Sequence, residues 1–256
     1  MPRADVAVPL ALPEGAYAFV RGVGFILTTP SAWFHAAVPV VTALVLACGL
    51  SGASLPLARQ AATWLLPGET ATSQAGGWAV TLILALFFIL MAALLALVLA
   101  QPLSGWALEA IARNQEQRLT GSAPPEPGFL RSILVGLRCS LFILVASLVT
   151  TALLLSVTLV FPPTAVVTVP LKVLTAGCYL AWDLTDYPLG LRGLGIGARL
   201  GWAWRNLGAF TLFGVCWALV LVVPGVFLLV LPMGVAGATC LVVASEQRQI
   251  PDALPA

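Results

Sequence analysis

Four long stretches of the chain carry no charged residue, and this feature restricts the fold more than any other. The stretches lie between Arg21 and Arg59, Glu69 and Glu109, Arg138 and Lys172, and Arg205 and Glu246. Each is longer than the ~20 apolar residues that a helix needs to cross a bilayer core. Because 60% of the residues are hydrophobic and only 9% are charged, the chain cannot cover itself with a polar surface. We therefore expect a membrane protein and exclude a conventional soluble enzyme.

Proline and glycine residues divide the uncharged stretches into six hydrophobic helical segments. The expected segments are 33–51, 78–100, 132–161, 166–185, 206–223 and 226–244. Residues 14–28 are expected to form a short helix along the membrane surface, because they mix aromatic residues with glycine and Arg21. Residues 101–131 are expected to form a cytoplasmic helix and loop. The sequence thus predicts an all-α membrane protein with a single membrane domain, 1–256.

The distribution of basic residues predicts the orientation of the chain. With both termini in the cytoplasm and six crossings, ten of the twelve basic residues fall on the cytoplasmic side. These ten are Arg3, Arg21, Arg113, Arg118, Arg131, Arg138, Arg192, Arg199, Arg205 and Arg248. Only Arg59 and Lys172 fall outside, as the positive-inside rule requires. A hairpin that enters the membrane and returns would give the same pattern, so the pattern leaves open whether every segment crosses fully.

Several kinds of chemistry are excluded by what the sequence lacks. The chain has one histidine, His35, and its five cysteines form no CxxC pair, so we expect neither a metal nor a disulfide framework. No Walker loop or GxSxG nucleophile motif occurs. The net charge of +2 is too small for a nucleic-acid partner. No cofactor is implied.

Three polar clusters remain as candidates for function or structure. Asp183 and Asp186, followed by Tyr187, share one face at the end of the fourth segment, and a carboxylate in hydrocarbon needs a cationic partner or water. Arg192 is the nearest candidate partner in the sequence. The alternative is a helix end that the headgroup layer hydrates.

The other two clusters lie on the expected cytoplasmic side. Glu109 and Arg113 form an i,i+4 pair on a helix that continues to Arg118, which is typical of a solvated helix. Arg192, Arg199 and Arg205 could attract an anion or could simply follow the positive-inside rule, and both interpretations stay open. The glycines between 190 and 201 are expected to form a flexible turn. In the last segment, the small residues of 234–239 would let helices approach closely.

Five short motifs in order resemble the CysZ-type sulfate permeases and their etoposide-induced relatives. They are Gln101-Pro102-Leu103-Ser104-Gly105, Arg118-Leu119-Thr120-Gly121, Asp186-Tyr187-Pro188, Phe213-Gly214 with Pro224, and the run from Leu231 to Thr239. The similarity extends from about residue 15 to residue 246. It implies two spanning helices, 33–51 and 78–100, and two helical hairpins, 132–185 and 206–244, that enter the membrane only partly. It also implies a homo-oligomer in the inner (plasma) membrane that passes sulfate inward.

One departure from the family pattern concerns the anion site. Members that bind sulfate carry a Gly-hydrophobic-Arg motif after the proline that opens the first span, whereas this chain has Pro30-Ser31-Ala32-Trp33-Phe34-His35. This stretch has no arginine, so Ser31, His35 and backbone N–H groups are the candidate donors, although oxyanions prefer charged donors. The sequence therefore supports two hypotheses: a permease or channel for a small inorganic anion, sulfate by default, and a membrane scaffold or biogenesis protein that kept the fold without the site.

Overall fold

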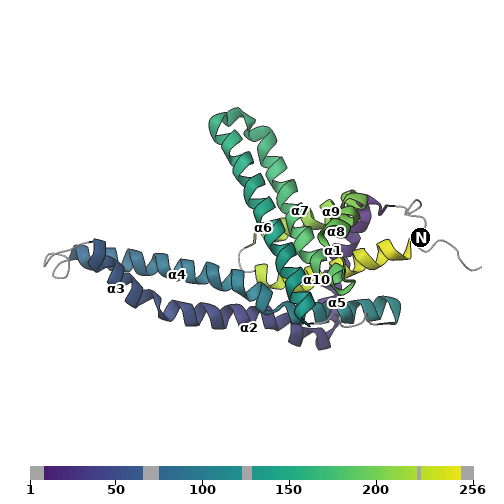
Figure 1. Ribbon diagram of the computed structural model, residues 1–256, viewed down its shortest axis with the longest axis horizontal. Helices are drawn as coiled ribbons and strands as arrows, with labels where there is room; N and C mark the ends of the chain where they lie inside the picture. The colour runs from purple at the N-terminus through teal and green to yellow at the C-terminus, as the bar shows by residue number, and fades with distance from the viewer. Residues whose placement is uncertain (1–8, 66–74, 123–128, 224–225, 249–256) are drawn as a thin grey trace, which may run out of the picture. The chain divides into compact units, whose positions relative to one another are not determined.

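A computed structural model describes residues 9–65, 75–122, 129–223 and 226–248. Every element in these residues is helical, as predicted (Figure 1). The helices are α1 (Leu12–Thr28), α2 (Pro30–Gly52), α3 (Ser54–Leu65), α4 (Ala75–Leu103), α5 (Gly105–Thr120), α6 (Phe129–Val160), α7 (Ala165–Leu191), α8 (Ile196–Arg205), α9 (Leu207–Val220) and α10 (Phe227–Gln247), with a short 3₁₀ helix, η2 (Pro162–Thr164), before α7.

Five helical stretches in the described part of the chain are long and apolar enough to cross a membrane. They are Pro30–Leu65, Gly77–Leu97, Leu141–Val160, Pro162–Leu191 and Leu229–Gln247. The α8–α9 pair, bent by 94°, would be a sixth. The expectation of about six hydrophobic segments is thus confirmed, because each predicted segment overlaps one of these stretches.

The chain divides into two compact units, residues 37–107 and the remainder. In the smaller unit, the amphipathic helix α3 packs along α4 through Ala58 and Ala62, which are one turn apart and buried. The large side chains of α4 point outward, including Leu82, Ile83 and Leu86. A helix that exposes such residues needs an apolar solvent, so lipid is its expected surroundings.

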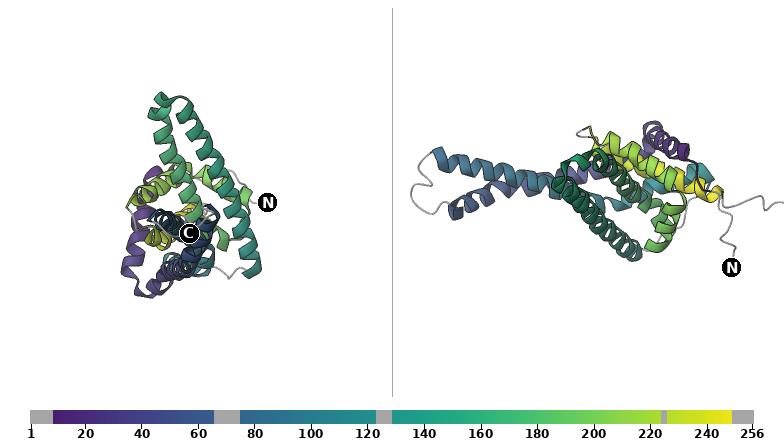
Figure 2. Two further views of the ribbon diagram at one scale, coloured as in Figure 1. Left: turned by 90° about the vertical axis from the view of Figure 1, so that its left-hand side faces the viewer. Right: turned by 90° about the horizontal axis from the view of Figure 1, so that it is seen from above.

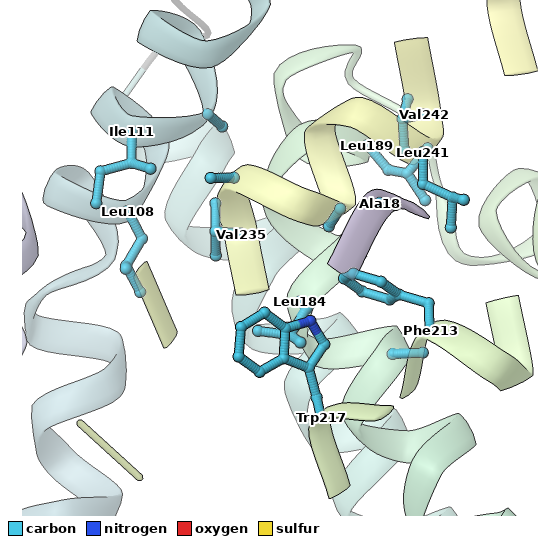
Figure 3. Close-up of a cluster of buried hydrophobic side chains, with 14 of the residues drawn as sticks. Ala18, Leu108, Ile111, Leu184, Leu189, Phe213, Trp217, Val235, Leu241 and Val242 are labelled. Atoms are coloured by element: carbon cyan, nitrogen blue, oxygen red, sulfur yellow. The ribbon is translucent and has the colours of Figure 1, made fainter. Parts of the chain in front are cut away.

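The larger unit has a core built from α1, α5, α7, α9 and α10. Figure 3 shows its centre, where Trp217 and Phe213 of α9 lie near Leu184 of α7, Ala18 of α1 and Val235 of α10. Each of these five residues is no more than 2% exposed. The α6–α7 hairpin extends from this core and is visible in all views (Figures 1 and 2). In contrast, none of the side chains of residues 141–160 in α6 is buried against the rest of the chain.

Glycine residues allow the helices of this core to touch through their backbones. A Cβ atom added at Gly22 of α1 would lie 2.3 Å from the Met233 carbonyl oxygen of α10. One added at Gly237 of α10 would lie 2.6 Å from the Ala18 carbonyl oxygen of α1. The predicted close approach along 234–239 is therefore confirmed. Because Gly15 and Gly22 both face the core, one side of α1 packs on α9 and α10.

Two details of the prediction were wrong at the end of the fourth segment. The helix continues through Pro188 to Leu191 instead of ending at residue 185, because proline removes one donor and membrane helices tolerate this loss. The glycine-rich stretch is not one flexible turn, since Gly197 and Gly201 lie inside α8. Within the stretch 190–201, only Gly193, with φ of 65°, has the left-handed conformation that glycine favours. The spacing of glycine residues alone does not distinguish a turn from a short helix at these positions.

The bend between α8 and α9 is held by buried side chains. Asn206 lies at the bend and accepts a hydrogen bond from the Leu10 N–H at 3.1 Å through its Oδ1 atom. In α8, the Trp202 Nε1 atom donates to Ser245 Oγ of α10 at 2.8 Å. Trp202 also packs edge-on against Phe210. Through Trp202, α8 is thus attached to α9 and α10.

Replacing Trp202 with phenylalanine should lower the free energy of unfolding by about 2 kcal/mol, because the substitution removes the bond to Ser245 and leaves a small cavity. Chemical unfolding in detergent micelles would measure the change. Trp204→Phe is the matched control on the same helix, since Trp204 is 70% exposed and should change stability by less than about 0.5 kcal/mol. Equal effects of the two substitutions would contradict the prediction.

Candidate functional site

Arg192, directly after α7, is the centre of a polar cluster that joins three helices. Its Nη1 and Nη2 atoms each lie 3.1 Å from a carboxylate oxygen of Glu116 on α5. Its Nε atom donates to Glu246 of α10, and its Nη2 atom donates to the second Glu246 oxygen at 2.7 Å. A fifth bond, from Nη1, goes to the Pro188 carbonyl oxygen at 2.8 Å. A guanidinium has five N–H donors, so all of them are used within the chain.

The charge of Arg192 is fixed by this environment. Burial of the guanidinium lowers its pKa, but the hydrogen bonds and charges of Glu246 and Glu116 outweigh burial, so the pKa is raised above its ordinary value. The group therefore stays protonated at every pH relevant to a cell. With two carboxylates around one guanidinium, the cluster formally carries one negative charge.

Arg199 of α8 is also held inside the chain. It is 2% exposed and forms an ion pair with Asp186 of α7. Its Nε atom donates to the Leu194 carbonyl oxygen at 2.8 Å. The prediction of Arg192 as the partner of the α7 carboxylates was therefore wrong, because the α7–α8 turn brings Arg199 to Asp186 while α5 and α10 supply the partners of Arg192.

Arg205, the third predicted arginine, lies at the exposed end of α8. Its Nε atom bonds to the Gly201 carbonyl oxygen of its own helix at 3.2 Å, and the neighbouring Trp204 is exposed. No ion pair in the described part of the chain involves Arg205. Its charge therefore faces the surroundings, whereas the charges of Arg192 and Arg199 are neutralised by carboxylates.

The start of α2 holds the predicted residues Ser31 and His35. Pro30 is the first helical residue, where a missing N–H costs nothing. The Trp33 indole donates to the Ile26 carbonyl oxygen of α1 at 2.7 Å and so connects the two helices. Ser31 is exposed and His35 is half-buried. Pro30 has no N–H, and the Ala32 N–H bonds to the Thr29 carbonyl oxygen at 2.9 Å, so the uncharged donors that an anion could use here come from Ser31.

The other predicted polar residues lie on α5 and α7. Asp183 is half-buried, and no ion pair to it is formed by the residues that the structure describes. Tyr187 is half-buried against the hydrophobic core. Glu109 and Arg113, one turn apart on α5, are half-buried, and the Arg118 guanidinium lies 5.1 Å from the Phe25 ring centroid of α1. Arg118 therefore packs on α1 through a cation–π contact, which the prediction of a solvated helix did not include.

Sequence reasoning missed several polar residues of this unit. Glu116 and Glu246 bind Arg192 across 76 and 54 positions of the chain. Glu14 forms an ion pair with Arg248, which also donates to the Pro9 carbonyl oxygen at 3.0 Å. A carboxylate beside a long apolar segment was the available signal, since a charge in that position needs a partner.

Within the described residues, no three histidine, cysteine, aspartate or glutamate side chains lie close enough together to hold a metal ion. The arrangement combines apolar helices with ion pairs at helix ends, an exposed cation on α8 and an uncharged donor set at the start of α2. These features define a multi-pass, all-α membrane protein in which polar groups gather at helix termini.

The chain belongs to the family of CysZ sulfate transporters and etoposide-induced 2.4 proteins. A family profile described as sulfate transporter CysZ/etoposide-induced protein 2.4 matches residues 18–232, which is most of the chain. The resemblance inferred from the five motifs is thereby confirmed. Membership supports a membrane role related to sulfate transport at the level of the family. No curated protein matches the chain at a significant level.

Proposed function

We propose that this protein is a CysZ-like permease or channel for a small inorganic anion, with sulfate as the default substrate. The observation that carries the proposal is the family match over residues 18–232 on a chain with several apolar helices. The proposal includes a homo-oligomer in the inner membrane with both termini in the cytoplasm. It includes no cofactor and no catalytic residue.

Among the predicted anion contacts, Arg205 is the one that is best placed to attract the substrate. Its guanidinium is exposed, so it raises the local concentration of anions without first breaking an ion pair. Ser31 and His35 at the start of α2 are the proposed contacts along the path. Arg192 and Arg199 would contribute directly only after their pairs with Glu116, Glu246 and Asp186 open.

Purified protein in liposomes should take up radiolabelled sulfate faster than empty vesicles. Arg205→Gln should slow uptake a few-fold at low ionic strength and less at high salt, because salt screens an exposed charge. Arg138→Gln is the control, because Arg138 is an exposed arginine of α6 on the same predicted side of the membrane as Arg205. Uptake equal to that of empty vesicles would remove the transport proposal.

The second candidate is a membrane scaffold or biogenesis protein that does not transport. It is favoured by the absence of arginine from residues 30–35 and by the saturated donors of Arg192. Trp33→Arg separates the two functions, because it places a cation where family members that bind sulfate have one. Sulfate binding that appears only in this variant would favour the scaffold, whereas binding already present in the unchanged protein would favour transport.

A further inference from the structure

Six polar residues of α7 lie along one face of a helix that is otherwise mostly apolar. Their spacings of three or four positions place them on the same side; they are Thr168, Lys172, Thr175, Tyr179, Asp183 and Asp186. The helix α6 contacts this face at two levels. Tyr179 donates to Thr150 Oγ1 at 2.7 Å, and the Thr158 and Thr168 hydroxyls lie 2.8 Å apart. A polar strip therefore runs between α6 and α7, which lie side by side (Figures 1 and 2).

Lys172, the only lysine in the sequence, is held in this strip by Thr158. Its Nζ atom donates to Thr158 Oγ1 at 3.2 Å. The Thr158 hydroxyl donates in turn to the Leu154 carbonyl oxygen at 2.7 Å, so Thr158 has no donor left. An ammonium has three N–H donors, and Lys172 uses one of them within the described residues. Two N–H donors of a half-buried cation thus remain for a ligand.

The hairpin does not need this charge to hold its two helices together. Hydrogen bonds between threonine and tyrosine side chains already join α6 to α7. Lys172 carries the only charge between Arg138 and Asp183, and its neighbours Leu171, Val173 and Leu174 are exposed apolar residues. A charged side chain inside a membrane segment is costly, and it marks an ion or substrate path where the chain does not neutralise it. Lys172 therefore needs an anionic partner.

The carboxylates that the structure describes are not available to Lys172. Four of them each form an ion pair with an arginine, and no ion pair in the described residues includes Lys172. Glu109 also has a partner. Asp183 lies eleven positions along α7, which is about 16 Å of helix and beyond the reach of the ammonium. A second copy of the chain would offer the same carboxylates, four of them already paired. The anion is therefore expected from outside the protein.

We propose that Lys172 is the charged donor of an oxyanion-binding site between α6 and α7, with sulfate as its ligand. The two remaining N–H groups of the ammonium bind the anion, and Thr158 positions the ammonium. Charged donors are the strongest partners of oxyanions, yet residues 30–35 contain no arginine, and Arg192 and Arg199 are paired with carboxylates. Lys172 supplies the missing cation. This inference rests on the proposed function, because it names a site for the transported anion.

Equilibrium binding of radiolabelled sulfate to the purified protein in lipid-free detergent, at constant ionic strength, tests the site. Lys172→Met should weaken binding about tenfold or more, because charge-assisted hydrogen bonds are lost, whereas Lys172→Arg should retain most of the affinity. Unchanged affinity in Lys172→Met, or no binding by the parent protein, would overturn the proposal. The melting temperature of each variant without sulfate checks that it is folded.

Three further variants complete the binding experiment. Thr158→Val keeps the charge but removes the bond that positions the ammonium, so it should weaken binding a few-fold; unchanged affinity would overturn the role of Thr158. Thr175→Val is the matched control on the same face, because the Thr175 hydroxyl bonds only to the Leu171 and Lys172 carbonyl oxygens of its own helix. Arg138→Gln, which removes an exposed charge from α6, controls for general electrostatics. Both controls should bind sulfate as the parent does.

Native mass spectrometry distinguishes sulfate from two other partners of Lys172. A phospholipid phosphate in the site would give retention of phosphatidylglycerol that depends on Lys172, without sulfate binding. A carboxylate from a second copy would give a smaller oligomer in Lys172→Met than in the parent. Either result would overturn the proposal.

Uptake of sulfate into liposomes separates failure of the site from failure of the proposed function. If Lys172→Met takes up sulfate as fast as the parent, the site is overturned while transport stands. If the parent binds sulfate through Lys172 but shows no uptake above empty vesicles, transport is removed and the binding site is supported.

Discussion

Replacing Gly214 with alanine should lower the free energy of unfolding by about 3 kcal/mol, the upper end of the range for overpacked cores. The Cβ atom of the new residue would lie 1.9 Å from the Gly177 carbonyl oxygen and 2.8 Å from the Ala181 Cβ atom, both of α7. Since the first of these is a backbone atom, relief requires α7 and α9 to separate. Chemical unfolding of the purified protein in detergent would measure the loss, and size-exclusion chromatography would detect misfolded material.

Gly208→Ala on the same helix is the matched control. The nearest atoms to a Cβ at this position belong to the Leu12 side chain, 3.9 Å away, which is ordinary contact. Alanine favours a helix by up to about 1 kcal/mol over glycine, so this variant should be as stable as the parent or more stable. If both substitutions changed stability equally, the close contact of α7 with α9 would not be essential to the fold.

The helices could be predicted from sequence because lipid excludes charge so strongly. Each uncharged stretch, such as the one between Arg138 and Lys172, can hold little other than membrane helices. The helix limits were less predictable at Pro188 and around Gly197. At such positions, contacts with distant parts of the chain decide whether a helix continues.

The candidate site was predicted less completely than the fold, because its contacts join residues that are far apart in sequence. Arg192, Arg199 and Arg205 look equivalent in the sequence, yet two of them are neutralised by carboxylates. Whether an arginine attracts a ligand or holds a helix end depends on which acidic residue the fold brings to it. For Arg192 this is decided by the tertiary fold, which brings Glu116 of α5 and Glu246 of α10 to the end of α7.

The ion pairs of the larger unit also change the interpretation of its positive charge. An excess of arginine beside membrane segments sets the orientation of the chain and is easily taken for an anion-attracting surface. Here Arg192, Arg199 and Arg248 each pair with a carboxylate from another helix. These arginines thus connect helix ends, and the attraction of an anion is left mainly to exposed residues such as Arg205.

Arg192→Gln should lower the free energy of unfolding by about 3 kcal/mol, the lower end of the range for breaking a buried ion pair. The Glu116 side chain is 12% exposed, so its carboxylate would be left near that of Glu246 with little water to screen it. We expect the lower end of this range of destabilisation because the Glu246 side chain is 44% exposed and its carboxylate can recover some hydration. Unfolding in detergent would measure the change.

Two further variants separate loss of the cluster from general loss of charge. Arg205→Gln removes an exposed arginine and should change stability by less than about 0.5 kcal/mol. Adding Glu116→Gln and Glu246→Gln to Arg192→Gln should recover part of the lost stability, because no unpaired carboxylate then remains. Recovery of stability would show that Arg192→Gln destabilises the protein by leaving the Glu116 and Glu246 carboxylates without a cationic partner. A triple variant no more stable than Arg192→Gln alone would instead place that cost in the bond to the Pro188 carbonyl oxygen, and the carboxylates would lose their assigned role.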